Sequence, residues 1–115
     1  MDLDQHARFD QLDPDRMLER IGELPQQCRA AWALTRELEL PPAYGATRHV
    51  VIVGMGGSAI GGALLRGLVA GECDVPITVV RGYTLPRFVQ GPDYLVIGCS
   101  YSGNTEETLS AFGQA

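Results

Sequence analysis

The feature that most constrains the fold is a short apolar run at residues 49–53, which reads His-Val-Val-Ile-Val. Polar and apolar positions do not alternate in it, so it predicts a strand that is buried on both faces, as in a parallel sheet. Glycines punctuate residues 54–57 directly after it, and residues 58–69 have the apolar pattern of a helix. The run therefore predicts a strand, a glycine turn and a helix in succession.

Two further strands are expected downstream. Residues 75–80 predict the second strand, with Pro76 at its first residues, and residues 94–99 predict the third. A Pro- and Gly-containing connection, residues 82–93, separates them, and a last helix is expected from Thr105 to Ala115. This succession is the α/β pattern, which implies a parallel sheet with right-handed crossovers.

The residues before the first strand predict helices. Asp13 is the expected N-cap and Pro14 the first helical position, and Pro25 should break or kink the helix that follows. The apolar stripe continues beyond Pro25 and includes Trp32, which we expect to pack in a core. The chain is therefore expected to consist of an N-terminal helical segment and an α/β part, which span residues 1–45 and 46–115.

Composition excludes several classes of function. The chain has 115 residues, of which 45% are hydrophobic, enough for one small domain. Its formal net charge is −5 and its nine cationic residues, all arginines, are spread along the chain, so nucleic acid and membrane surfaces are not expected partners. The apolar runs are much shorter than the ~20 residues of a membrane span, and no signal peptide is recognisable. We expect a cytoplasmic protein.

Cysteines and histidines do not indicate a metal site. Cys28, Cys73 and Cys99 are far apart and odd in number, which argues against a disulfide scaffold and suits a reducing cytosol. His6 and His49 are also far apart. We therefore expect no metal and no cofactor.

Two polar loops are the candidates for chemistry. The first, residues 54–62, reads Gly-Met-Gly-Gly-Ser-Ala-Ile-Gly-Gly. Its glycines allow the backbone to approach a ligand closely, and the N–H groups at the start of a helix attract an anion. Close packing of the helix could explain Gly61 and Gly62, but it does not explain Ser58 beside Gly57.

The second loop, residues 100–108, reads Ser-Tyr-Ser-Gly-Asn-Thr-Glu-Glu-Thr. A capping box between Asn104 and Glu107 is expected at the start of the last helix, but it does not require the other hydroxyls. A phosphate monoester carries a charge of about −1.5 to −2 and three strong acceptor oxygens, which hydroxyls and backbone N–H groups can satisfy without lysine. The hydroxyl-bearing candidates in this loop are Ser100, Ser102 and Thr105.

The two loops meet if the strands have the order 2-1-3. Both loops then leave the carboxyl ends of neighbouring strands at a topological switch point, where α/β sheets bind ligands. We therefore expect one crevice lined by residues from both loops, namely Gly57, Ser58, Ser100, Ser102 and Thr105.

GMGGSAIGG, followed about forty residues later by SYSGNTEET, resembles the sugar isomerase (SIS) domain, and more narrowly the bifunctional phosphoglucose/phosphomannose isomerases. The resemblance implies a three-layer, flavodoxin-like α/β fold with a five-stranded parallel sheet, here incomplete at about three strands and preceded by the N-terminal helices. It also implies a homodimer that interconverts glucose 6-phosphate or mannose 6-phosphate with fructose 6-phosphate. One departure is Ala63, where the family often has Asp.

The resemblance further implies roles for residues. It makes Gly57, Ser58, Ser100, Ser102 and Thr105 substrate-binding positions, chiefly for phosphate. The family's catalytic Glu, His and Lys are expected beyond Ala115, so no catalytic residue is assigned here and the chain alone is expected to be an inactive fragment.

Two alternatives stay open. Non-catalytic SIS domains sense sugar phosphates with the same loops. Less favoured is an NADP-binding Rossmann domain, for which Gly54-x-Gly56-x-x-Ala59 fits the glycine fingerprint and Arg81 could suit a 2′-phosphate. That alternative leaves the second loop unexplained.

Overall fold

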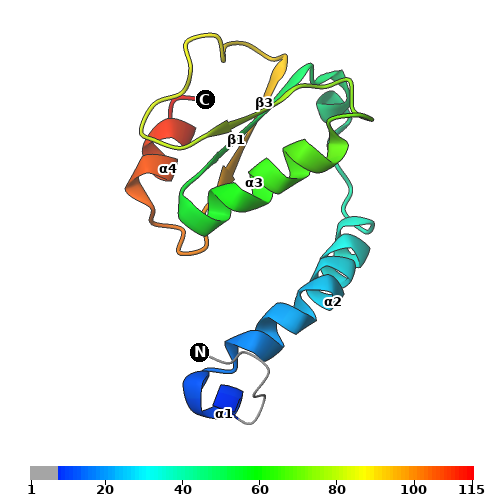
Figure 1. Cartoon of the computed structure of the whole chain (residues 1–115). Coiled ribbons are helices and arrows are strands. Elements are labelled where there is room, and N and C mark those ends of the chain that lie inside the picture. The colour runs from blue at the N-terminus through cyan, green and yellow to red at the C-terminus, as the bar shows by residue number, and fades with distance from the viewer. Residues whose placement is uncertain (1–7) are drawn as a thin grey trace. The chain divides into compact units, whose positions relative to one another are not determined.

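The computed structural model describes residues 8–115 (Figure 1). The chain divides into two compact units, and the boundary between them in the sequence falls after Leu40. The first unit contains helices α1 (Phe9–Leu12) and α2 (Met17–Thr35). None of the helices in the described part of the chain is both long and apolar enough to cross a membrane.

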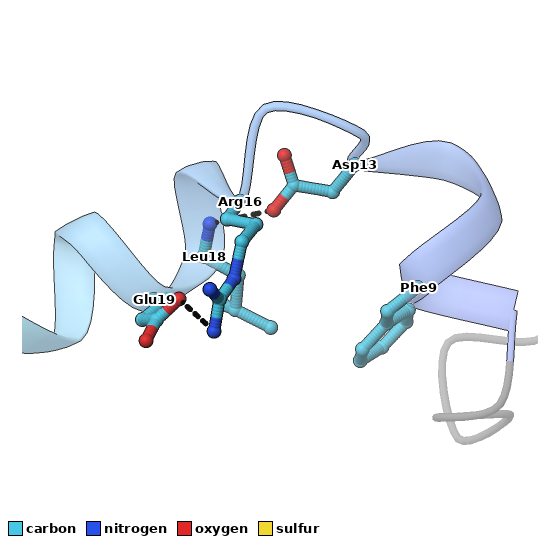
Figure 2. Close-up of a pocket in the computed structure, with 5 residues that line it drawn as sticks. All are labelled: Phe9, Asp13, Arg16, Leu18 and Glu19. Carbon is cyan, nitrogen blue, oxygen red and sulfur yellow. Dashed lines mark hydrogen bonds and ion pairs between the residues drawn. The ribbon is translucent and has the colours of Figure 1, made fainter.

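The turn between α1 and α2 is built around Asp13. Its Oδ1 atom accepts a hydrogen bond from the Met17 N–H and its Oδ2 atom one from the Leu18 N–H, both at 2.7 Å. The expectation that Asp13 is the N-cap residue is wrong in position, since Arg16 holds that place with a left-handed φ of 54°. Asp13 nevertheless caps the helix, because the turn brings its carboxylate back onto the first amides. Figure 2 shows this turn and the exposed ion pair between Arg16 and Glu19, at 2.6 Å.

Two other expectations concern the first unit. The break that was one expected effect of Pro25 is absent, since helix α2 continues through this residue; every residue of this helix is exposed, so water can reach the carbonyl that loses its partner. Trp32 does not pack in a core, since 71% of its surface is exposed. The only other helix of the described unit, α1, is four residues long and too short to cover an apolar face.

The second unit is an α/β structure, as predicted. Its sheet has three parallel strands in the order β2-β1-β3, and its helices begin and end within a few residues of the expected bounds. Helix α3 begins at Gly56 rather than Ser58, and strand β2 begins after Pro76, which has no N–H to donate. In chain order the elements are η2 (Pro42–Ala46), β1 (His49–Gly54), α3 (Gly56–Val69), β2 (Ile77–Val80), β3 (Tyr94–Cys99) and α4 (Glu106–Phe112).

Helices α3 and α4 cover opposite faces of the sheet (Figure 1). A methyl group added at Gly62 of α3 would lie 2.8 Å from the Cγ2 atom of Ile52, and one added at Gly98 would lie 3.0 Å from the Phe112 ring of α4. Gly98 pairs with Val53, the neighbour of Ile52 on β1, and successive residues of a strand point to opposite faces. Ile52 and Ala59 are also buried, and the largest buried cluster lies on the α4 side and comprises Val51, Val53, Val80 and Ala111.

Gly62→Ala should destabilise the protein. The new methyl group would overlap the stiff, buried side chain of Ile52, which is 4% exposed, and overpacking costs about 1–3 kcal/mol. Gly61→Ala is the matched control, since nothing lies within 4 Å of its added methyl group and alanine favours a helix by up to about 1 kcal/mol. Urea unfolding of both variants checks this; equal stabilities would contradict the packing argument.

Acid should loosen the start of α2. The Leu18 and Met17 N–H groups hold the pKa of Asp13 below its ordinary value of 3.8. A lowered pKa in the folded state means that the carboxylate stabilises the turn above about pH 3.8 and that this stabilisation is lost as the pH falls through the lowered pKa. The protection of the Met17 and Leu18 amides from hydrogen exchange, relative to the intrinsic rate at each pH, should therefore fall in that range. In Asp13→Asn this protection should not change over the same range. If it fell in the variant as well, Asp13 would not be the cause.

Candidate functional site

The two polar loops lie together at the carboxyl end of the sheet. Gly54 and Cys99, the last residues of β1 and β3, are register partners. A methyl group added at Gly54 would lie 3.1 Å from the Cys99 carbonyl oxygen and 3.3 Å from the Ser58 carbonyl carbon. The start of α3 and the loop between β3 and α4 are therefore neighbours, as Figure 1 shows. The strand order on which the expected crevice depends is the one observed.

The fold calls for glycine at several positions of the first loop, for a different reason at each. Gly54 is required by the close approach of Cys99, Gly56 has a φ of +51°, and Gly62 packs on Ile52. Gly57 and Gly61 have none of these reasons: both have an ordinary φ and nothing lies within 4 Å of an added methyl group, so close packing explains Gly62 but not Gly61. Gly57 is the one that lies in the first turn of α3. Folding alone does not account for a glycine at this exposed position, which leaves open space at the mouth of α3.

Ser58 borders that space. Its backbone N–H donates to the Met55 carbonyl oxygen at 3.1 Å, which closes the first turn of α3. Met55 is the N-cap residue, and no side chain caps this helix. Within residues 8–115 the Ser58 hydroxyl forms no hydrogen bond, and its side chain is half-buried.

The three hydroxyls of the second loop gather around Thr105. Its Oγ1 atom lies 3.0 Å from Ser100 Oγ and 3.5 Å from Ser102 Oγ. The same serines accept backbone hydrogen bonds, Ser100 from the Gly103 N–H at 3.1 Å and Ser102 from the Asn104 N–H at 3.2 Å. Gly103, with a φ of +73°, allows the tight turn. Local hydrogen bonds thus hold this hydroxyl cluster (Ser100, Ser102 and Thr105) in place.

The expected capping box between Asn104 and Glu107 is wrong. Thr105 is the N-cap residue of α4, and no side chain caps the helix. The Asn104 N–H is engaged with Ser102 instead, because the loop folds onto its own serines before the helix begins.

Glu107 has an electrostatic partner that sequence reasoning missed. The negative charge of Glu107 raises the pKa of the hydroxyl of Tyr83, a residue of the connection after β2, and desolvation and the charge of Glu106 raise it further. No sequence signal joins the two residues, which are brought together by the path of the connection.

His49 lies away from the two loops. His49 is at the start of β1, the opposite end from the loops, where its Nε2 atom lies 2.8 Å from Thr78 Oγ1 and its ring stacks on Tyr94; His6 is outside the described residues. Among the residues described, no three His, Cys, Asp or Glu side chains gather in a way that could hold a metal ion.

The five candidate residues can bind but cannot move a proton. Gly57 and Ser58 lie beside the hydroxyl cluster, and glycine, serine and threonine side chains do not titrate near neutral pH. Hydroxyl and backbone N–H donors next to open space suit an anion rich in oxygen acceptors. The arrangement is that of a binding site.

Comparisons with known proteins give one consistent result. The chain is 46% identical over 99 residues to the "Bifunctional phosphoglucose/phosphomannose isomerase" of Caldicellulosiruptor bescii, which covers 86% of this chain and 29% of the relative. Proteins of the same name from Aquifex aeolicus and Thermoplasma acidophilum are 52% identical over 69 residues and 44% identical over 71 residues; these matches cover 59% and 62% of this chain and 21% and 22% of the relatives.

The chain thus spans less than a third of the length of these curated relatives. No family model matches it, and no solved structure matches it.

Proposed function

Since the chain belongs to the family of bifunctional phosphoglucose/phosphomannose isomerases, we propose that it supplies the phosphate-binding part of such an enzyme. The whole protein would interconvert glucose 6-phosphate or mannose 6-phosphate with fructose 6-phosphate. The observation that carries the proposal is the meeting of the hydroxyl cluster with the open mouth of α3 at one end of the sheet.

Phosphate would bind by exchange of hydrogen bonds. The hydroxyls of Ser100, Ser102 and Thr105 now bond to one another and to loop amides; each could turn its proton to an ester oxygen while keeping its place in the loop. Gly57 leaves room for the ester, and Ser58 adds a further hydroxyl. Hydrogen bonds to a charged group contribute about 1.5–3 kcal/mol each, so a few such donors suffice without lysine.

The isomerisation itself needs groups that the candidate residues do not supply. Ring opening exposes C1 and C2, and a general base must then move a proton between them through an enediol. The candidate positions hold only glycine, serine and threonine. We therefore propose that the base and its helpers, a Glu, a His and a Lys by resemblance, lie in other parts of the protein, and that this chain alone has no turnover.

Ligand titrations test the proposal against its alternatives. The intact protein should bind fructose 6-phosphate, seen by calorimetry, and should convert it to glucose 6-phosphate. Binding without turnover would favour a sugar-phosphate sensor. Binding of NADPH in place of fructose 6-phosphate would overturn the proposal in favour of a dinucleotide site.

Ser102→Ala should weaken fructose 6-phosphate binding to the intact protein by roughly 1–3 kcal/mol, the cost of losing a hydrogen bond to a charged group. Thr35→Ala is a control, since it removes a hydroxyl that bonds only to the Trp32 carbonyl oxygen in α2. Its affinity should equal that of the wild type. Equal affinities for all three proteins would remove Ser102 from the site.

A further inference from the structure

A hollow of about 290 Å³ lies between the end of α3 and the start of β2. Its lining combines one arginine, Arg66, and one thiol, that of Cys73, with apolar residues, namely Val69, Val75, Pro76 and Ile77. Strand β2 starts at the end of the parallel sheet opposite to the two polar loops, and none of the five candidate residues lines the hollow. The hollow is therefore separate from the candidate phosphate site.

Arg66 gives the hollow its positive charge. It is the only charged residue of α3 and follows Gly62, which packs on Ile52 of the sheet, by four positions, so it lies on the side of the helix turned to the sheet. Within the described part of the chain its guanidinium forms no ion pair, not even with Glu72 or Asp74 nearby in sequence. A cation suits the last turn of a helix, but that does not require it to line an apolar hollow.

A second donor lies at the edge of the sheet. Val50 pairs with Ile77, and the Val50 N–H donates to the Pro76 carbonyl oxygen at 2.9 Å. Since a residue in a parallel ladder bonds to the neighbours of its partner, the Ile77 N–H points away from β1. Strand β2 is the outer strand of the described sheet, which leaves this N–H without a strand partner beside the hollow.

This lining suits a small monocarboxylate with a short apolar tail. A guanidinium matches a carboxylate with two parallel hydrogen bonds, and the apolar walls favour burial of the tail. The volume is just below the roughly 300–1,000 Å³ of most ligand pockets, so the ligand must be small. A doubly charged phosphate ester would find only one cation here and mostly apolar walls, which cannot satisfy its oxygens.

We propose that the hollow between α3 and β2 is a further binding site of this protein, which takes small monocarboxylates with a short apolar tail and holds their carboxylate on Arg66. The proposal is independent of the proposed function, because the two sites share no residue.

The thiol of Cys73 can report whether the hollow is occupied. It is exposed and donates to the Val75 carbonyl oxygen at 3.6 Å, so both partners line the hollow. In the intact protein, near-saturating hexanoate should slow the alkylation of Cys73 by iodoacetamide about threefold or more, because the bound tail covers the thiol. Hexanol, which lacks the carboxylate, and inorganic phosphate, which lacks the tail, should not protect it. Cys28 is the internal control, since it is exposed in α2 and does not line the hollow.

Three variants test the role of the lining, each judged by the ratio of Cys73 alkylation rates with and without hexanoate. Arg66→Gln should lose the protection, because it removes the partner of the carboxylate. Arg81→Gln is the matched control: it removes an arginine that directly follows the other end of β2 and should keep the protection. Ala70→Leu enlarges a side chain of the lining without changing its charge and should lose the protection as well.

Several results would overturn the proposal. Hexanoate that does not protect wild-type Cys73, protection that persists in Arg66→Gln or Ala70→Leu, or equal protection by hexanol would each do so. So would a Cys73 that does not react at all in the intact protein, because another part of the protein would then cover the hollow.

Discussion

At the carboxyl ends of β1 and β3, the backbone of Gly54 lies so close to that of Cys99 that a methyl group between them would sit 3.1 Å from a carbonyl oxygen. This contact brings together two loops that are more than thirty residues apart in sequence. A side chain at Gly54 would be tight against the Cys99 carbonyl oxygen, and the neighbouring backbone would have to shift by a few tenths of an ångström. The site therefore depends on a close backbone contact that favours glycine, made at the end of a strand whose core residues, Val51 and Val53, are buried.

The proposed phosphate site would also have to accept a strong anion in an acidic chain. The net charge is −5, and two glutamates adjoin the hydroxyl cluster. Hydroxyl and backbone N–H donors can bind an anion without a cationic side chain, because their hydrogen bonds strengthen when the acceptor is charged. The loop keeps its own donors together, since Ser100, Ser102 and Thr105 are hydrogen-bonded to one another.

The sequence predicted the parts of this arrangement that local patterns determine. The unalternating run at residues 49–53 predicted a central strand, and the spacing of hydroxyls predicted the cluster around Thr105. The wrong expectations concern the choice between competing local partners. The Asn104 N–H could donate to the Glu107 side chain in a capping box or to Ser102 Oγ, and Asp13 could cap a helix from the N-cap or from an earlier turn. The effect of Glu107 on the pKa of Tyr83 left no sequence signal, because it depends on the path of a connection without regular structure.

A division of labour follows from the chemistry of the proposed substrate. In a hexose 6-phosphate the ester is on C6, whereas the proton moves between C1 and C2, at the other end of the open chain. A unit that grips the ester therefore does not need a general base of its own. What it contributes is binding energy spent on orientation, since a sugar that is held by its phosphate presents its reactive carbons in a restricted geometry. A rigid cluster suits this task better than a mobile lysine would, because Ser100, Ser102 and Thr105 are already ordered by their mutual hydrogen bonds and little further entropy is lost on binding.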